Sequence, residues 1–363
     1  MNEPILALDN VSKHFVARRS VLGRPSAVIR AVDGVSFEVR EGETLALVGE
    51  SGCGKSTVGR LALRLLEPTA GSIRLAGRDL ATLSGSELRR ARAGAQLIFQ
   101  DPYGSLNPRM TVGEMLAEPL LLHSDLKPSS RRERVGELMR IVGLNVAHVE
   151  RYPHEFSGGQ RQRIAIARAL AGGPKLVVCD EPVSALDVSI RSQILNLLQD
   201  LQQRLGLAYL FISHDLAVVK HIATRVAVMY LGRIVESAAC EQLFGEPRHP
   251  YTQALLSAVP VLTAEHRRAR RILPGDLPSP LAPPPGCHLH PRCAHAQAVC
   301  ATVRPQLIAG PDQRATACHL WRDIVSSMAR TPIPEAAFSA SLQRLFRAFD
   351  AARQDGALAP DGK

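Results

Sequence analysis

The stretch GESGCGKS, Gly49 to Ser56, follows the apolar run 45–48 and precedes a helix-like segment from Val58 to Leu66. A buried strand, then GxxxxGK[ST], then a helix is the arrangement that a phosphate-binding P-loop requires. Its three glycines let the backbone wrap around an anion, with N–H groups and a helix N-terminus facing it. Lys55 would neutralise the β- and γ-phosphates, and the Ser56 hydroxyl would complete a Mg²⁺ shell. A chance glycine turn does not explain both flanking elements, so the stretch predicts a nucleoside triphosphate site.

The bulk composition is that of a globular protein large enough for more than one domain. The chain has 363 residues, of which 45% are hydrophobic and 21% charged. No apolar run approaches the length of a membrane span, and the start MNEPILALDNVSKHF lacks the regions of an export signal. We therefore expect a cytoplasmic protein. The formal net charge of +10 is spread along the chain, which is compatible with nucleic acid, with anionic lipid or with a plain solvated surface.

Two further features point to phosphate chemistry. The buried-strand run 175–179 ends in Asp180 and Glu181. A carboxylate at the carboxyl edge of a parallel strand can reach Mg²⁺ beside a P-loop, and the next one can polarise an attacking water. Taken alone, the pair would be read as a helix cap. The motif SGGQ, Ser157 to Gln160, opens the helix-like run 161–170 and predicts a second anion site.

Six motifs stand along the chain in this order: GESGCGKS, LIFQD with Gln100, FSGGQRQR, LVVCDEP, SALD and FISHD. In order and approximate spacing they resemble the ABC-transporter ATPases, and the resemblance covers residues 4 to about 258. It implies an α/β fold with a P-loop ABC ATPase core, an antiparallel β subdomain and a helical subdomain at about residues 105–165. The ATPase domain would span residues 1–260.

The resemblance also implies roles for individual residues. Lys55, Glu181 and His214 would be catalytic, with Glu181 as the base and His214 on the γ-phosphate. Ser56, Gln100 and Asp180 would hold Mg²⁺. Phe15 would stack on the adenine of ATP, with a core position on an edge strand as the alternative. The remaining ATP contacts on the same chain would be Gly49, Glu50, Ser51, Gly52, Cys53, Gly54 and Thr57. In the family two chains sandwich two nucleotides head to tail, so a further set would act in trans: Ser157, Gly158, Gly159, Gln160 and Asp187.

Two stretches narrow the resemblance to the dipeptide/oligopeptide importer branch, DPYGSLNPRMTVGEML (101–116) and RHPYTQALLSAVP (248–260). The chain is similar to the second of the two ATPases that such importers pair. This implies a second ABC ATPase subunit in a paralogous heterodimer, two transmembrane permease subunits and an extracytoplasmic solute-binding protein, with no nucleic acid. It also implies a peripheral position on the cytoplasmic face of the cell inner membrane.

Four of the seven cysteines crowd into 32 residues behind a proline-rich segment, LPGDLPSPLAPPPGC, which reads as an extended linker. Cys287, Cys293, Cys300 and Cys318 are spaced C-x5-C-x6-C-x17-C. In a cytosolic chain such clustering favours a metal over disulfides. Members of this branch carry a four-iron–four-sulfur cluster in this region, and the four positions match that pattern. The resemblance thus implies an iron–sulfur cluster, with zinc and free thiols as alternatives. Residues 261–325 would form the linker and a small Cys-rich C-terminal domain.

The last part of the chain, residues 326–363, has an amphipathic pattern. Pro334–Glu335 is a plausible helix start, and the apolar residues that follow have helical spacing: Phe338, Leu342, Leu345, Phe346 and Phe349. Such a helix would pack on the chain's own surface or on a partner ATPase. The residues after Asp355 are expected to be disordered.

A soluble ABC-type ATPase acting on nucleic acid or ribosomes is the alternative function, because the basic surplus would suit nucleic acid. Repair types carry long coiled-coil insertions, whereas only 56 residues separate Gln100 from Ser157, and translation-factor types carry two cassettes in one chain. A regulatory iron–sulfur sensor with a degenerate ATPase is a third possible function. The intact catalytic motifs disfavour it, namely Lys55, Asp180, Glu181 and His214. The sequence favours an ATPase subunit that energises an importer of peptides or similar solutes.

Overall fold

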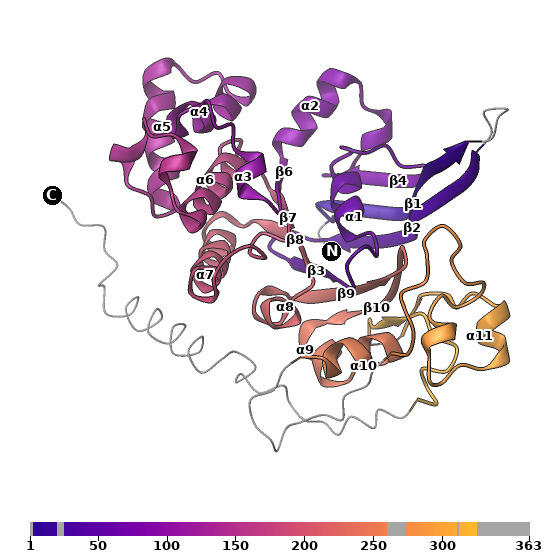
Figure 1. Ribbon diagram of the computed structural model, residues 1–363. Helices are drawn as coiled ribbons and strands as arrows, with labels where there is room; N and C mark the ends of the chain where they lie inside the picture. Colours follow the sequence, from indigo (N-terminus) through magenta and orange to yellow (C-terminus); the bar gives the residue numbers. More distant parts are fainter. Residues whose placement is uncertain (1–2, 20–24, 260–272, 311, 325–363) are drawn as a thin grey trace.

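The computed structural model describes residues 3–19, 25–259, 273–310 and 312–324 (Figure 1). The strands of these residues form two sheets, one of eight strands and one of four. The amphipathic helix expected after Pro334 lies outside the described residues.

The larger sheet forms the centre of the molecule, with strand order β11-β12-β10-β9-β3-β8-β7-β6. The neighbours from β9 to β6 run parallel, and β3, β7 and β8 are buried along their whole length. Parallel strands covered on both faces read as continuous apolar runs, as these do. Their carboxyl ends meet at one edge of the sheet. The bounds are β3 Thr44–Val48, β6 Ala95–Ile98, β7 Leu176–Asp180, β8 Ala208–Ser213, β9 Arg225–Tyr230 and β10 Arg233–Ala239.

The smaller sheet is antiparallel, with strand order β2-β1-β4-β5. Its bounds are β1 Leu6–Arg19, β2 Pro25–Val39, β4 Ala70–Leu75 and β5 Arg78–Asp79. Helix α1 (Lys55–Ala62) contacts β1 and β2 of this sheet and β7 and β8 of the larger one. One buried cluster, which includes Val11, Val35, Leu47, Val58 and Leu210, joins the two sheets through this helix. The P-loop therefore leads into a helix fixed from both sides.

A group of helices stands on the opposite side of the molecule from the smaller sheet (Figure 1). It comprises α3 Pro102–Ser105, α4 Val112–His123, α5 Pro128–Ile141, η2 Val146–His148, η3 Pro153–Glu155 and α6 Gly158–Leu170. Leu116, Leu138 and Ile164, one from each long helix, are fully buried in a shared cluster. The remaining helices before the C-terminal segment are η1 Leu80–Thr82, α2 Gly85–Ala93, α7 Val188–Leu205, α8 Leu216–Ile222, α9 Cys240–Gly245 and α10 Pro250–Ser257.

The cysteine-bearing segment, residues 273–324, is built onto the larger sheet. It contains η5 His290–Arg292, α11 Ala298–Thr302, β11 Ile308–Ala309 and β12 Ala315–Thr316. Strand β12 pairs antiparallel with β10, with Thr316 opposite Glu236. An ion pair of 2.6 Å between Arg248 and Asp312 fastens the same segment beside α10. In Figure 1 the segment lies against β10 and α10.

Within these described residues, no helix combines the length and the apolar character needed to cross a membrane.

Two buried histidines make the stability of this arrangement depend on pH. Burial lowers the pKa of His249 to about 3 and that of His288 to about 4. In the unfolded chain a histidine titrates near 6.5, so the unfolded state binds protons first as the pH falls. The folded state therefore loses stability from about pH 6.5 downward, by an amount on the order of 1 kcal/mol per histidine at pH 5.5.

We expect His249→Gln to lose less stability on acidification than the wild type does. Urea unfolding of both chains at pH 7.5 and pH 5.5 measures the difference in lost stability, which should be on the order of 1 kcal/mol. The exposed His154 gives a control variant, His154→Gln. Equal losses for the wild type and His249→Gln would contradict the prediction.

Candidate functional site

The P-loop connects β3 to α1 in a conformation that depends on glycine. Gly49 has φ 154°, and a Cβ atom there would lie 2.1 Å from the carbonyl oxygen of Met229. Gly54, the residue before α1, has φ 108° in the left-handed region, and its Cβ would lie 2.1 Å from the Ala31 carbonyl oxygen. Larger residues at either position would displace neighbouring backbone. The first N–H groups of an α-helix have no partner within the helix, so the start of α1 is suited to binding an anion.

The functional side chains of the P-loop follow directly in the first turn of α1. Lys55 is buried and its Nζ donates to the carbonyl oxygens of Gly49 at 2.8 Å and Glu50 at 3.0 Å. The Ser56 hydroxyl donates to Oδ1 of Asp180 at 2.8 Å. Burial raises the pKa of Asp180, while the hydrogen bond from Ser56 opposes that rise. A hydroxyl and a carboxylate oxygen side by side are ligands that Mg²⁺ prefers.

Glu181 follows Asp180 in the chain and contacts side chains from the loops after two other strands, β6 and β8. Its Oε2 accepts from Nε2 of Gln100 at 3.0 Å, and its Oε1 lies 3.0 Å from Nδ1 of His214. Glu181 has φ 49°, which is uncommon outside glycine and turns up at functional sites. Its backbone N–H donates to the Ile212 carbonyl oxygen at 3.0 Å. Residues from the ends of β6, β7 and β8 thus meet beside the P-loop.

A cavity of about 470 Å³ lies over the P-loop. Ten of the residues expected to contact ATP or to act in catalysis line it: Ser51, Gly52, Cys53, Gly54, Lys55, Ser56, Thr57, Gln100, Glu181 and His214. Six lining residues were not expected from the sequence, namely Ile29, Arg30, Ala31, Leu231, Gly232 and Pro280. Pro280 comes from the proline-rich segment, and its carbonyl oxygen accepts from the Arg30 N–H at 3.2 Å. The proline-rich segment therefore forms part of the cavity wall, in addition to linking the ATPase core to the cysteine-bearing segment.

Other predicted residues lie beside the cavity or away from it. Gly49, Glu50 and Asp180 support it without lining it. Phe15 is 37% exposed and does not line it, although Ile29, its partner across β1 and β2, does.

The SGGQ motif does not face this cavity. Ser157 caps α6, with its hydroxyl accepting from the Gln160 N–H at 3.3 Å while Gln160 Oε1 accepts from the Ser157 N–H at 3.0 Å. Gly159 packs against α7, where a Cβ would lie 2.5 Å from Ile190. Gly158 is partly exposed, and Asp187 is exposed at the start of α7. An exposed helix N-terminus of this kind is suited to an anion supplied by another molecule.

The four clustered cysteines come together around one narrow cavity. Cys287, Cys293, Cys300 and Cys318 all line it, together with His249, His290, His295 and His319. Burial raises the pKa of Cys287 and Cys293, and raises that of Cys318 to about 12. In the part of the chain that the structure describes, no three His, Cys, Asp or Glu side chains form a group that could hold a single metal ion.

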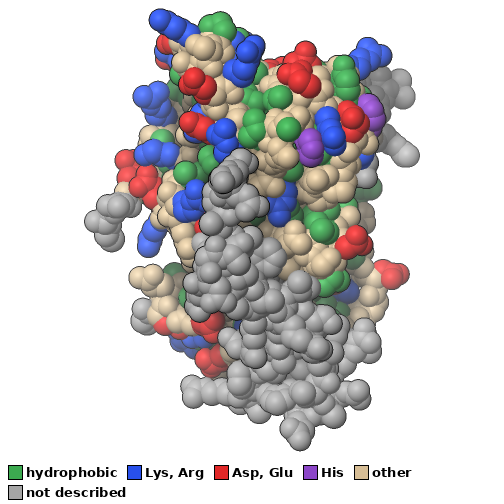
Figure 2. Space-filling view, turned by 90° about the vertical axis from the view of Figure 1, so that its left-hand side faces the viewer, with side chains coloured by type: hydrophobic (Ala, Val, Ile, Leu, Met, Phe, Trp, Pro, Cys, Tyr) green, Lys and Arg blue, Asp and Glu red, His purple; other side chains and the backbone are tan. Residues whose placement is uncertain are grey.

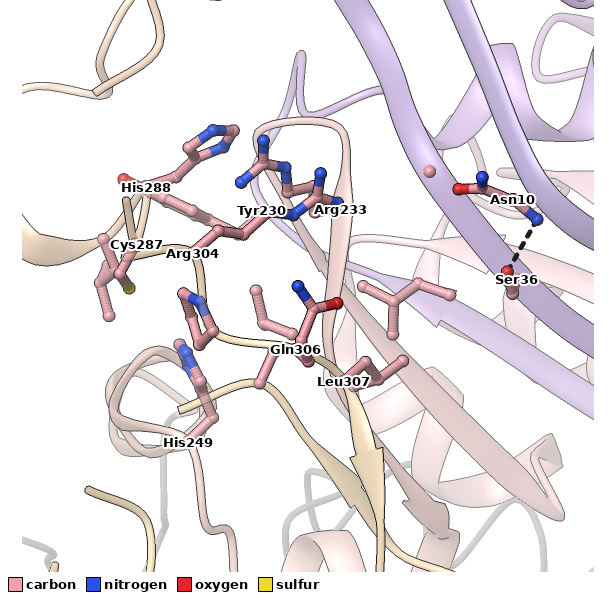
Figure 3. A pocket seen from close by; sticks show the side chains of 16 residues that line it. Asn10, Ser36, Tyr230, Arg233, His249, Cys287, His288, Arg304, Gln306 and Leu307 are labelled. Atoms are coloured by element: carbon pink, nitrogen blue, oxygen red, sulfur yellow. Dashed lines mark hydrogen bonds between the residues drawn. The ribbon is translucent and has the colours of Figure 1, made fainter. Parts of the chain in front are cut away.

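A second cavity, of about 330 Å³, lies between the smaller sheet and the cysteine-bearing segment (Figure 3). Arg233 and Arg304 line it, and both pair with Asp33, at 2.6 Å and 3.9 Å. Tyr230 and Cys287 also line it. The two arginines and Asp33 are therefore structural links between β2, β10 and the C-terminal segment.

Comparison with known proteins identifies two matched regions in the chain. Residues 32–184 match the model of the ABC transporter family, and residues 235–300 match that of the oligopeptide/dipeptide transporter C-terminal region. The chain is 53% identical over 307 residues to the dipeptide transport ATP-binding protein DppF of Escherichia coli (strain K12), covering 85% of this chain and 92% of the relative. It is 50% identical over 322 residues to the oligopeptide transport ATP-binding protein AppF of Bacillus subtilis (strain 168), covering 88% and 98%.

A solved structure of similar fold is the dimeric ATP-binding cassette MJ0796 bound to ADP and phosphate. It is 28% identical, has a TM-score of 0.58, and the match covers 65% of this chain and 98% of that one. The chain therefore belongs to the ABC-transporter ATPases, in the family of oligopeptide and dipeptide transport ATP-binding proteins.

Proposed function

We propose that the chain is the subunit that binds and hydrolyses ATP to energise an importer of dipeptides, oligopeptides or similar solutes. The observation that carries this is the meeting of Ser56, Asp180, Glu181, Gln100 and His214 at one edge of the sheet, around the cavity over the P-loop. The printed names of the relatives, which describe dipeptide and oligopeptide transport, support the substrate class.

In this proposal each side chain has a distinct part in phosphoryl transfer to water. Lys55 neutralises the β- and γ-phosphates, to which backbone N–H groups of the loop also donate. Ser56, Gln100 and Asp180 would hold Mg²⁺, for which the adjacent hydroxyl of Ser56 and carboxylate of Asp180 are suitable ligands. Glu181 orients and deprotonates the water, and His214, which contacts Glu181, positions the γ-phosphate. We assign Phe15 to stacking on the adenine.

A second ATPase subunit completes the site. Ser157, Gly158, Gly159 and Gln160 lie at an exposed helix start outside the chain's own cavity, so we assign them, with Asp187, to a nucleotide on the opposing subunit. The dimeric state of the MJ0796 cassette supports this arrangement. We further propose a paralogous heterodimer bound to two permease subunits at the cytoplasmic face of the inner membrane, and a solute-binding protein outside it.

The four cysteines are proposed to hold a four-iron–four-sulfur cluster. All four thiols line one cavity. Burial raises the pKa of Cys287, Cys293 and Cys318, and a bound metal would offset that rise because a coordinating thiol gives up its proton. A cluster takes one thiolate per iron, whereas zinc needs four ligands around a single ion.

We assign residues 1–260 to the ATPase domain, about 105–165 to its helical subdomain, and 261–325 to the linker and a small Cys-rich domain. Residues 326–363 would form the C-terminal part of the chain, with an amphipathic helix and a disordered tail.

The alternative, an ABC-type ATPase acting on nucleic acid or ribosomes, calls for a basic surface. On the face shown in Figure 2, acidic and basic side chains alternate over the described residues and do not form one basic patch. Opposite charges interspersed in this way give little net attraction to a phosphate backbone.

A pull-down of the tagged full-length chain from membranes under anaerobic conditions tests the proposal. Two multispanning proteins and a second P-loop ATPase should co-purify, and the sample should carry iron and absorb broadly in the visible range. Ribosomes or nucleic acid in place of membrane proteins would overturn the transport function. A colourless sample containing zinc would overturn the cluster alone.

A further inference from the structure

Arg292 reaches from the cysteine-bearing segment to the P-loop. It is the last residue of η5, directly before Cys293, and is only 8% exposed. Its Nη1 lies 3.2 Å from Oε2 of Glu50, the second residue of GESGCGKS, and donates to the Tyr230 hydroxyl at 3.4 Å. Its Nε donates to the Pro274 carbonyl oxygen at 3.3 Å. A guanidinium fixed by three partners is a stiff connection between two parts of the chain.

Glu50 is held from its backbone as well. Its N–H donates to the Tyr251 hydroxyl at 2.8 Å, and its carbonyl oxygen accepts from Lys55 Nζ at 3.0 Å. The rings of Tyr230 and Tyr251, both fully buried, lie 4.6 Å apart. The position of Glu50 thus depends on a packed group of aromatic rings and on Arg292. A shift of any of these partners would move the loop that binds phosphate.

The negative charge of Glu50 indicates how the contact with Arg292 would affect ATP binding. A carboxylate in a P-loop repels the triphosphate that the loop must bind. The guanidinium of Arg292 compensates that charge at 3.2 Å, in a site where the arginine is largely shielded from water. Loss of the guanidinium would leave a negative charge in the loop and free the Glu50 side chain.

We propose that Arg292 is a positioning residue for ATP binding, through which the state of the cysteine cavity controls the P-loop. The inference rests on the proposed ATPase function. Cys293 lines the cysteine cavity and is one peptide bond from Arg292. Cys287 packs against the same hydrophobic cluster as Tyr230 and Tyr251, and Figure 3 shows Tyr230, Cys287 and His288 at the neighbouring cavity. A rearrangement of the cysteine cavity that moves Cys293 would therefore also move Arg292 and weaken ATP binding.

Titration of a fluorescent ATP analogue into the purified full-length chain tests the role of Arg292. Arg292→Ala should weaken binding about tenfold, the loss expected for a charge-assisted hydrogen bond at a largely buried site. KM for ATP should rise by a similar factor while kcat changes little, and Arg292→Lys should recover part of the affinity. Asp312→Asn is the matched control, because the Arg248–Asp312 pair fastens the same segment without touching the P-loop.

Two further variants distinguish the proposed role of Arg292 from a general loss of folded structure in Arg292→Ala. Glu50→Gln in the Arg292→Ala background should restore part of the affinity, since it removes the uncompensated charge. Cys293→Ala should weaken ATP binding in the wild type and have no added effect in Arg292→Ala.

Wild-type affinity in Arg292→Ala, or an equal loss in Asp312→Asn, would overturn the inference. An additive effect of Cys293→Ala would show that the cysteine cavity does not act through Arg292. A wild-type chain that fails to bind the analogue would instead overturn the proposed ATPase function.

Discussion

Glu181→Gln is expected to abolish most ATP turnover while leaving ATP binding intact. The carboxylate contacts Gln100 at 3.0 Å and His214 at 3.0 Å and lines the cavity over the P-loop. An amide of the same shape keeps a hydrogen bond to one of these partners but cannot accept a proton from water. Removal of a general base typically costs about 10²–10⁴-fold in rate. Phosphate release at saturating ATP measures the loss, and the fluorescent analogue measures binding.

The same variant also tests the dimer. Because each nucleotide would contact both subunits, a chain that binds ATP without hydrolysing it should remain in the closed dimer. Size-exclusion chromatography with ATP and Mg²⁺ should then show a larger species than without nucleotide. Glu137→Gln, which removes an exposed carboxylate on α5, serves as the matched control. Turnover of Glu181→Gln at the wild-type rate would refute the assigned role of the base.

Several site residues that were expected from the sequence follow strand ends, although the roles of Gln100 and His214 were implied by the family resemblance. Glu181 and His214 each come directly after a buried strand, β7 and β8, and Gln100 lies two residues after β6. In a parallel sheet such positions meet at one edge whatever the loops between them do. The helix after the P-loop is less well predicted, since it spans Lys55–Ala62 where 58–66 was expected. The left-handed Gly54 ends the loop earlier and places Lys55 in the first turn.

Contacts made by the C-terminal segment could not be predicted in this way. Pro280 lines the P-loop cavity and Arg292 contacts Glu50, yet each lies more than 200 residues from its partner along the chain. The segment has short elements and no hydrophobic periodicity, so nothing in its sequence indicates which surface it covers. The pairing of β12 with β10 could not be predicted either, because a strand of two residues is too short to show an alternation of apolar and polar residues. The cysteine spacing predicted a shared site, but not its connection to the P-loop.

Lys55→Met is expected to have the largest effect on nucleotide affinity. In the described structure Nζ is buried and donates to the carbonyl oxygens of Gly49 and Glu50. When a triphosphate occupies the loop, the ammonium group is the cation placed to neutralise it. Loss of charge-assisted hydrogen bonds to two phosphates corresponds to about 100-fold in affinity. The control is Lys175→Met, which removes an exposed lysine paired with Glu41 at 3.2 Å.

The variant must be separated from simple damage to the loop, because two carbonyl oxygens also lose their donor. A series of nucleotides makes that separation. If Lys55 acts by charge on the β- and γ-phosphates, the loss should be large for ATP, smaller for ADP and slight for AMP. A collapsed loop would weaken all three by the same factor, since it would remove the N–H groups that bind any phosphate. A uniform loss would therefore assign Lys55 to holding the loop through Gly49 and Glu50, and a graded loss assigns it to the triphosphate.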